Sequence, residues 1–259
     1  MPEFLEVLNH GSIREVVMNR PKQLNALNLG LMTELADAMT DAAVEPSVRG
    51  VLLTGRGRAF CAGGDLKWAL EFNNDPGTSL HVLAGQLNRL AVQIRTMPKP
   101  VVAAVHGAAA GAGFMLALAC DFRVIEESAF FQQAYTSNGL CIDGGGTFSL
   151  PRLVGLARAL EIAVFDERIP AGKALEWGLV TRLVPDGTAR EESLKMLQDL
   201  VCRSLHSFAC VKELLNGSFQ RSFEEQAEWE RRFLVACARH ADGREGLQAF
   251  VEKRPPRFV

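Results

Sequence analysis

An aspartate, Asp143, stands between an apolar run and three glycines in the segment LCIDGGGTFSL, residues 140–150. A carboxylate in apolar surroundings is suited to proton transfer, because neighbours such as Leu140, Ile142 and Phe148 would raise its pKa. Asp followed by Gly is also a strong turn signal, since the short carboxylate bonds to backbone N–H groups ahead of it. Taken alone, the segment favours a turn, and a catalytic role for Asp143 depends on the rest of the chain.

Two glycine-bearing turns could stabilise negative charge. They are AFCAGGDL, residues 59–66, and HGAAAGAGF, residues 106–114, and each follows a predicted buried strand and opens a predicted helix. A helix N-terminus presents unpaired N–H groups and partial positive charge, so two such turns facing each other would make a pocket for a developing oxyanion. Neither is a nucleotide loop, because the Lys-Ser/Thr of a P-loop and a well-placed GxGxxG are missing.

The elements that must position these residues alternate between strand and helix. Asn28 is the predicted N-cap of the first helix, and the segment at 70–80 is predicted to be a loop. This alternation indicates an α/β fold whose strand-end loops carry the site. The predicted elements are two short strands within 4–18, a helix at 28–43, a strand at 48–55, an amphipathic helix at 79–97, and strands at 101–105, 122–127 and 129–134.

From Arg190 onward the pattern predicts helices only, at 191–205, 208–216, 223–240 and 244–253. A helical tail on an α/β core more often provides a packing or oligomerisation surface than chemistry. We therefore predict a core with the site at 1–189 and a helical oligomerisation region at 190–259.

Composition excludes several classes of protein. The chain has 259 residues, of which 48% are hydrophobic and 22% charged, with a formal net charge of -2, as is usual for a globular protein without a basic field for nucleic acid. The apolar stretch 101–120 begins with β-branched residues and is broken by glycines, which favours strand, turn and buried helix over a membrane span.

The cysteines indicate a reducing compartment and no metal site. They stand singly, without a CxxC pair or a Cys/His group at zinc spacing, so we expect reduced thiols and no metal. The start MPEFLEVLNH has no basic region followed by an apolar core, and with no leader seen we expect a cytoplasmic location. The six cysteines are at positions 61, 120, 141, 202, 210 and 237.

Five segments, in order, make the chain resemble the enoyl-CoA hydratase/isomerase, or crotonase, family. The resemblance implies a spiral of repeated β-β-α turns, a helical C-terminal region that packs into a homotrimer or a dimer of trimers, and acyl-CoA thioester substrates. CoA would be part of the substrate, so no separate cofactor is expected. The segments are NRPKQLNAL (19–27), AFCAGGDLK (59–67), KPVVAAVHGAAAGAGFMLALACDFRV (99–124), GGGTFSLPRLVG (144–155) and EGLQAFVEKRPPRF (245–258).

The same resemblance implies an oxyanion hole formed by the backbone N–H groups of Gly64 and Ala112. Many relatives have Gly where this chain has Ala112, but the donor is main chain, so the added methyl need not matter; Gly111 is a possible substitute. Lys22 and Lys67 stand where relatives place basic residues near the CoA phosphates.

The chain differs from the hydratases of the family in the residues that act as catalytic acid and base. Those enzymes use two glutamates, and Met115 and Tyr135 occupy the two positions here. Hydration needs one group to activate water and another to protonate carbon, so this site is poorly suited to it. Asp143 falls where some isomerases of the family carry an acidic residue, and one carboxylate suffices for a 1,3-proton shift. Together with Met115 and Tyr135, Ala62 and Trp68 are expected to contact the substrate.

Three alternatives stay open. Asp143 could serve a hydratase, or the chain could bind CoA thioesters without turnover. Asp143 could also be a nucleophile, as in a dehalogenase relative, but that reaction needs a histidine on the preceding helix, which offers only His81 at its start and Asn88 near the expected place. Cys61 and Cys141 are predicted to be buried spectators, since no histidine is placed to activate them.

Overall fold

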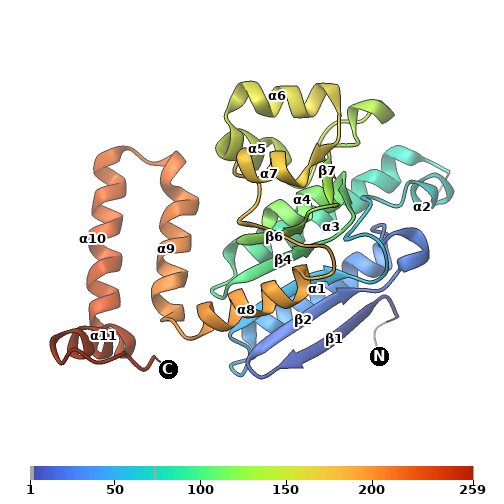
Figure 1. The fold of residues 1–259 in the computed structure, drawn as a ribbon. Helices are drawn as coiled ribbons and strands as arrows, with labels where there is room; N and C mark the ends of the chain where they lie inside the picture. Colours follow the sequence, from blue (N-terminus) through green and yellow to red (C-terminus); the bar gives the residue numbers. More distant parts are fainter. Residues whose placement is uncertain (1–2, 73, 259) are drawn as a thin grey trace.

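A six-stranded sheet forms the centre of the molecule (Figure 1). The computed structural model describes residues 3–72 and 74–258. The first two strands are antiparallel and the later neighbours are parallel. The strand order is β1 (Leu5–His10), β2 (Ile13–Met18), β3 (Gly50–Gly55), β4 (Val101–Val105), β6 (Phe122–Glu126) and β9 (Arg182–Val184).

A second, smaller sheet contains β5 (Ala108–Ala110), β7 (Phe130–Gln132) and β8 (Ile169–Pro170). A strand of the large sheet is followed by one of the small sheet and then by a helix in β4–β5–α4 (Ala112–Ala119) and in β6–β7–α5 (Gly146–Val154). A bridge from Cys61 to Ala109 adds a further turn of the same kind, β3–Cys61–α2 (Leu66–Glu71). The repeated β-β-α spiral predicted from the sequence is confirmed.

Helices cover both faces of the large sheet, which explains why β3 and β4 are apolar along their lengths. Alternate residues Val51, Leu53, Val101 and Ala103 join the main core, which includes α1 (Leu29–Val44) and α3 (Pro76–Thr96). Leu52, Val102 and Ala104 point the other way, against α8 (Ala189–Val201). This is the two-residue period of a strand.

The helix starts follow their capping residues. The Asn28 side chain accepts a hydrogen bond from Leu31 N at 2.9 Å, so the predicted N-cap is confirmed. The predicted loop at 70–80 is shorter than expected, because α2 extends to Glu71 and α3 already begins at Pro76. The side chain of Asp75 caps α3 ahead of the proline, a combination typical of a helix start.

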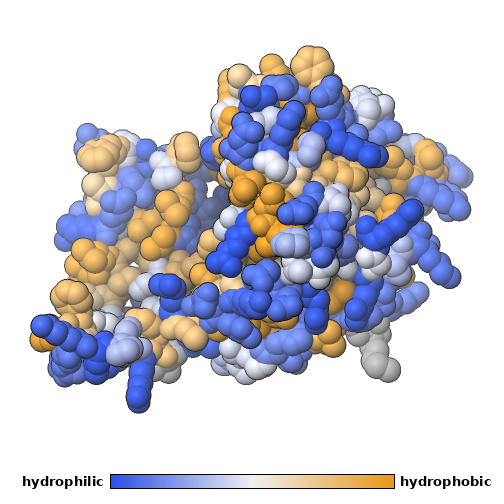
Figure 2. Space-filling model, viewed as in Figure 1, coloured by the Kyte–Doolittle hydropathy of each residue, from blue (hydrophilic) through white to orange (hydrophobic). Residues whose placement is uncertain are grey.

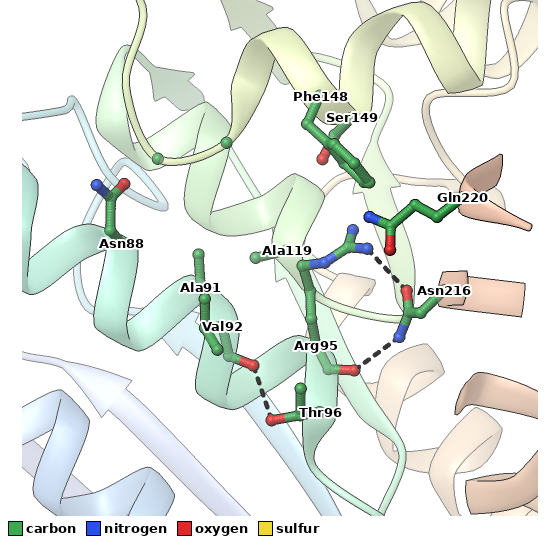
Figure 3. Close-up of a pocket in the computed structure, with 12 residues that line it drawn as sticks. Asn88, Ala91, Val92, Arg95, Thr96, Ala119, Phe148, Ser149, Asn216 and Gln220 are labelled. Atoms are coloured by element: carbon green, nitrogen blue, oxygen red, sulfur yellow. Dashed lines mark hydrogen bonds between the residues drawn. The ribbon is translucent and has the colours of Figure 1, made fainter. Parts of the chain in front are cut away.

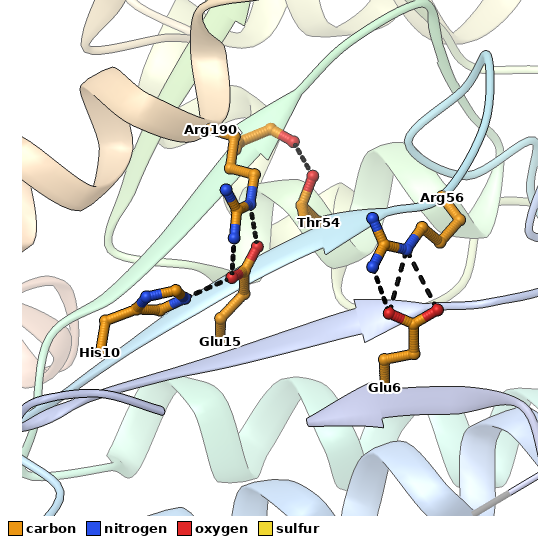
Figure 4. A network of polar contacts seen from close by, with 7 residues as sticks. Glu6, His10, Glu15, Thr54, Arg56 and Arg190 are labelled. Atoms are coloured by element: carbon orange, nitrogen blue, oxygen red, sulfur yellow. Dashed lines mark hydrogen bonds and ion pairs between the residues drawn. The ribbon is translucent and has the colours of Figure 1, made fainter. Parts of the chain in front are cut away.

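An ion pair between a buried glutamate and a half-exposed arginine joins α8 to the sheet (Figure 4). Glu15 on β2 is fully buried, and its two carboxylate oxygens accept from Arg190 Nε and Nη2 at 2.5 and 2.6 Å. His10 Nε2 lies 2.6 Å from the same carboxylate. Burial acts to raise the pKa of Glu15, but the hydrogen bonds from Arg190 and His10 outweigh it and leave that pKa below its ordinary value. The helix α8 thus packs on the sheet, and the domain division at 189/190 stays a prediction.

The remaining C-terminal helices form an arm that extends from the core (Figure 1). They are α9 (Leu205–Gly217), α10 (Phe223–Arg239) and α11 (Ala241–Val251), so the helical tail is confirmed. Hydrophobic side chains are spread over this arm in Figure 2. Those with large exposed fractions include Leu215, Phe219, Phe223, Leu234, Leu247, Phe250 and Val251.

No helix in the described part of the chain is long and apolar enough to cross a membrane. The apolar stretch 101–120 contains β4, β5 and the eight-residue helix α4, in agreement with the interpretation from the glycines.

Candidate active site

The two glycine turns lie side by side. Cys61 N donates to Ala108 O at 3.1 Å, and Ala110 N donates to Cys61 O at 2.9 Å. Gly63 has a φ of 108°, and a Cβ at this position would lie 2.9 Å from Ala110 O. Only a glycine allows the turns to approach this closely in that conformation. The predicted arrangement of two facing turns is therefore present.

Each turn supplies a backbone N–H without a partner among the described residues. Ala112 is the first residue of α4, where no intrahelical acceptor exists. Gly64 lies opposite Leu27 in a parallel bridge, in which Leu27 N donates to Gly63 O at 2.7 Å and Asp65 N donates to Leu27 O at 2.9 Å. These bonds use the groups on either side of Gly64 and leave its own N–H unpaired.

A cavity of about 120 Å³ lies at these two turns. Among the sequence-predicted residues, Ala62, Gly64, Gly111, Ala112, Tyr135 and Asp143 all line it. The rest of its wall is mostly apolar and comes from α1, α2, α3 and the loop before Asp143, with Met32, Leu66, Leu80, Leu83 and Leu140. The structure therefore brings the carboxylate and the two turns to one small, largely apolar space.

Tyr135 and Asp143 form a hydrogen-bonded pair in this cavity. The phenol O–H of Tyr135 donates to Asp143 Oδ1 at 2.5 Å. Burial raises the pKa of Asp143, and the bond from Tyr135 offsets part of that rise. Burial, together with the charge of Asp143, also raises the pKa of Tyr135, so the phenol keeps its proton. Tyr135 is therefore a hydrogen-bond donor to the carboxylate, a contact that the sequence interpretation missed.

The apolar neighbours predicted for Asp143 are only partly in place. Leu140 lines the cavity, but Phe148 lines a different one. Ile142 packs against Gly146, because a Cβ on that glycine would lie 2.6 Å from Ile142 Cγ2. Phe148 lies on α5, which follows the turn at Gly144 and Gly145 and carries this side chain into the other cavity, so the expectation for Phe148 is wrong. Ile142 precedes Asp143 directly but does not line the cavity.

Four other predicted site residues do not line the cavity. Met115 is buried beneath Gly144 and Gly146, and Trp68 stacks on Phe72 with ring centroids 4.5 Å apart. Lys22 is exposed, and the Lys67 side chain is 85% exposed, with its Nζ 3.9 Å from Glu71 Oε1. A direct contact of Met115 with substrate in this cavity is not supported, and the roles of both lysines toward CoA stay predictions.

The residues needed for nucleophilic chemistry lie elsewhere. His81 is exposed on α3, and Asn88 lines a different cavity from Asp143. Cys61 is buried, and burial raises its pKa to about 12, which makes it a poor nucleophile. Cys141 is exposed, so its predicted burial is wrong. The described lining of the cavity contains no histidine to support attack by Asp143.

A larger cavity of about 370 Å³ lies between α3, α5 and α9 (Figure 3). Arg95 Nη2 donates to Asn216 Oδ1 at 2.8 Å, and Asn216 Nδ2 donates back to Arg95 O at 3.0 Å. Gly144 lines this cavity and packs against Leu87 and Met115. Its described lining contains no carboxylate, whereas Asp143 lines the smaller cavity, so the smaller cavity is the candidate for catalysis.

The β-β-α spiral, the two facing glycine turns and the carboxylate in their cavity define a crotonase-fold protein. The family model for enoyl-CoA hydratase/isomerase matches residues 9–259, and the chain belongs to that family. It is thus an enzyme of the enoyl-CoA hydratase/isomerase family, and membership implies acyl-CoA substrates.

Similar proteins carry both hydratase and isomerase names. The chain is 42% identical to a probable enoyl-CoA hydratase of Rhodobacter capsulatus, over 94% of this chain and 93% of that protein. It is 34% identical to the 1,2-epoxyphenylacetyl-CoA isomerase of Escherichia coli, over 100% and 99%. The crystal structure of an enoyl-CoA hydratase from Polaromonas sp. JS666 superimposes with a TM-score of 0.94 at 36% identity, covering 98% of this chain and 99% of that one.

Proposed function

We propose that this enzyme moves the double bond of an acyl-CoA thioester, converting a 3-enoyl to a 2-enoyl group or rearranging a related ring substrate, with Asp143 as the proton carrier. One observation carries the proposal: a single carboxylate shares its cavity with two unpaired backbone N–H groups, and no second carboxylate lines the described part of that cavity. Such a site can stabilise an enolate and move one proton.

The two N–H groups would hold the thioester oxygen. As the α proton leaves, negative charge builds on that oxygen, and the N–H groups of Gly64 and Ala112 are already fixed by their turns. Fixed donors cost no reorganisation during the reaction, and each is typically worth a factor of about 10²–10³ in rate. The enolate is thereby stabilised without a metal or a charged side chain.

Asp143 then removes the α proton and returns it to the γ carbon. Burial raises the pKa of this carboxyl, which makes it a stronger base once ionised. The hydrogen bond from Tyr135 holds the carboxylate in one position during both transfers. In this scheme Tyr135 is a positioning residue, and Asp143 is the catalytic residue.

Hydration by Asp143 is the second candidate, and the hydratase names among the relatives favour it. Tyr135 is the nearest additional proton source, but donating its proton would leave a tyrosinate beside a carboxylate in a buried cavity. Burial and the charge of Asp143 both raise the pKa of Tyr135, which opposes that step. We therefore place isomerisation first.

The test compares wild type, Asp143→Asn and a control, Asp186→Asn, whose exposed carboxylate accepts from Ser128 N in a turn. Each protein receives 3-enoyl-CoA and 2-enoyl-CoA, and the products are resolved by mass and retention. We expect interconversion without a gain of water, a loss of about 10²–10⁴-fold in Asp143→Asn, and no change in the control. A product heavier by water supports a hydratase, and tight binding without any product supports a non-catalytic thioester binder.

We also propose a homotrimer or a dimer of trimers. Beyond the arm, α6 (Leu156–Phe165) exposes a second apolar surface with Leu156, Leu160, Val164 and Phe165. Two different apolar surfaces on one chain are what a head-to-tail ring requires. We further propose a cytoplasmic location, supported by six free cysteines, and no cofactor beyond the CoA of the substrate.

A further inference from the structure

Three metal-binding side chains meet between two helices of the arm, far along the chain from Asp143. His206 and Cys210 are one turn apart on α9, and Cys237 is in the last turns of α10. Their imidazole nitrogen and two sulfur atoms all lie within 4.8 Å of one another. No metal site was expected from the sequence, because no Cys/His group stands at zinc spacing. Cys237 is separated from the other two residues by the whole α9–α10 connection.

Stacking and hydrogen bonds order the side chains next to these three residues. The His240 ring stacks on the His206 ring with centroids 4.1 Å apart and an interplanar angle of 11°. Nδ1 of His240 accepts from Asp242 N at 3.2 Å, which fixes the orientation of the stacked ring. Asp242 is buried, and its carboxylate accepts from Ser204 Oγ at 2.7 Å. The stacked His240 ring thus lies beside a buried carboxyl group, with Asp242 Oδ2 3.8 Å from its Nδ1.

Other roles for the group fit less well. His206 Nε2 lies 3.8 Å from Cys210 Sγ, which is a long contact for an activating base. The three donor atoms lie within 4.8 Å of one another, and one nitrogen with two sulfurs at such distances suits a borderline-soft metal ion.

We propose that His206, Cys210 and Cys237 bind a borderline-soft divalent cation, with Zn²⁺ the best match. Zinc takes thiolate sulfur at about 2.3 Å and imidazole nitrogen at about 2.0–2.1 Å, so tetrahedral ligands lie about 3.3–3.8 Å apart. The three donor atoms lie within 4.8 Å of one another, so the most distant pair would have to approach by at most about 1 Å. Rotation of the side chains can supply such a movement. Both thiols lose their protons to solvent, and the fourth ligand is water.

The consequence of binding is mechanical. The ion would tie α9 to α10 near the point where α11 begins, and so stiffen the arm that carries the exposed apolar side chains. The site lies apart from the cavity of Asp143, and none of its three ligands lines that cavity. The inference therefore does not rest on the proposed reaction.

The experiment uses the full chain, reduced and stripped with a chelator, and titrates it with Zn²⁺ and with Co²⁺. We expect one ion per chain, a thiolate-to-cobalt charge-transfer band and a higher Tm with Zn²⁺. Loss of any one ligand should weaken Zn²⁺ binding by at least ~10–100-fold, which is the usual effect of losing a residue that only hydrogen-bonds to a ligand. The three variants are Cys210→Ser, Cys237→Ser and His206→Ala. Cys202→Ser removes an exposed thiol outside the group and should change nothing.

A second measurement covers the case in which a variant does not fold. In wild type, Zn²⁺ should protect Cys210 and Cys237 from alkylation and leave Cys202 reactive. The proposal is overturned if the reduced wild type binds no Zn²⁺, if Cys202→Ser weakens binding as much as the ligand variants, or if Cys210 and Cys237 form a disulfide while neither is protected by metal.

Discussion

At the scale of single residues, two opposing influences set the state of Asp143. Burial raises the pKa of the carboxyl, and the hydrogen bond from Tyr135 stabilises its charged form. A proton carrier needs both, because a fully exposed carboxylate is a weak base and an unsupported buried one stays protonated. The pair thus offers a direct handle on the pH dependence of activity.

Tyr135→Phe removes the donor and keeps the ring. The pKa of Asp143 should rise further, so the acid limb of kcat/KM, which reports the carboxylate form, should move to higher pH. A hydrogen bond to a charged group is worth about 1.5–3 kcal/mol, which corresponds to about 1–2 pH units. A pH profile that stays in place would show that Tyr135 does not set the pKa of the catalytic carboxyl.

Ala112→Pro tests the proposed oxyanion hole at the first position of α4. Proline is tolerated there, because this N–H has no intrahelical partner and the ring fixes a helical φ. We expect near-normal thermal unfolding and a fall in kcat/KM of about 10²–10³-fold. Ala112→Gly keeps the N–H and is the matched control; equal activity in the Pro and Gly variants would exclude this donor.

At the scale of elements, contacts that are distant in sequence hold the layers together. Arg190 on α8 reaches Glu15 on β2, and the buried carboxylate has Arg190 and His10 as partners (Figure 4). A buried charge that loses its partner is costly, whereas an exposed pair such as Arg56 with Glu6 contributes little. The two pairs therefore form a matched comparison.

Arg190→Met should lower the free energy of unfolding at neutral pH by about 1.5–3 kcal/mol. This is the usual contribution of a hydrogen bond to a charged group, and we use it because the Arg190 side chain is half exposed. The folded pKa of Glu15 is lowered, so its stabilisation is present above the ordinary value of 4.5 and is lost as pH falls through the folded pKa. The difference between wild type and variant should shrink on acidification. Urea unfolding across this range measures it.

Arg56→Met is the control for that series and should cost at most about 1 kcal/mol at neutral pH. A penalty for Arg190→Met that stays constant down to the acid limit, or one matched by Arg56→Met, would contradict the assignment of the effect to the buried carboxylate.

At the scale of the whole molecule, the arm leaves large apolar side chains in solvent (Figure 2). A surface with several large exposed apolar side chains is a candidate interaction site. The arm and α6 expose different side chains, so a ring of copies would pair the arm of one chain with α6 of the next.

Charge substitutions on the two surfaces should show this pairing. Leu160→Glu on α6 and Phe223→Glu on the arm should each reduce the proposed trimer to smaller species, measured by light scattering during gel filtration. When the two variants are mixed, the intact arm of Leu160→Glu can bind the intact α6 surface of Phe223→Glu. The other two surfaces carry the new charges, so a dimer should form but no closed ring. Recovery of full trimers on mixing, or no loss in either single variant, would contradict a head-to-tail interface.

The sequence by itself determined the elements and the parts of the site that depend on local chemistry. The capping residue Asn28, the glycine turns and the apolar runs act within a few residues, and the structure places them as their patterns indicate. Local errors remained at the segment 70–80, where the Asp75-Pro76 start signal was overlooked, and at the predicted helix 191–205, which runs past the end of α8 at Val201.

Only the tertiary structure decided which side chains meet. The bond from Tyr135 to Asp143, the burial of Met115 away from the cavity and the convergence of Cys237 with His206 and Cys210 all depend on packing between elements. One sequence carries no record of such distances, because a side chain's partner across a core is set by the shape of everything between them.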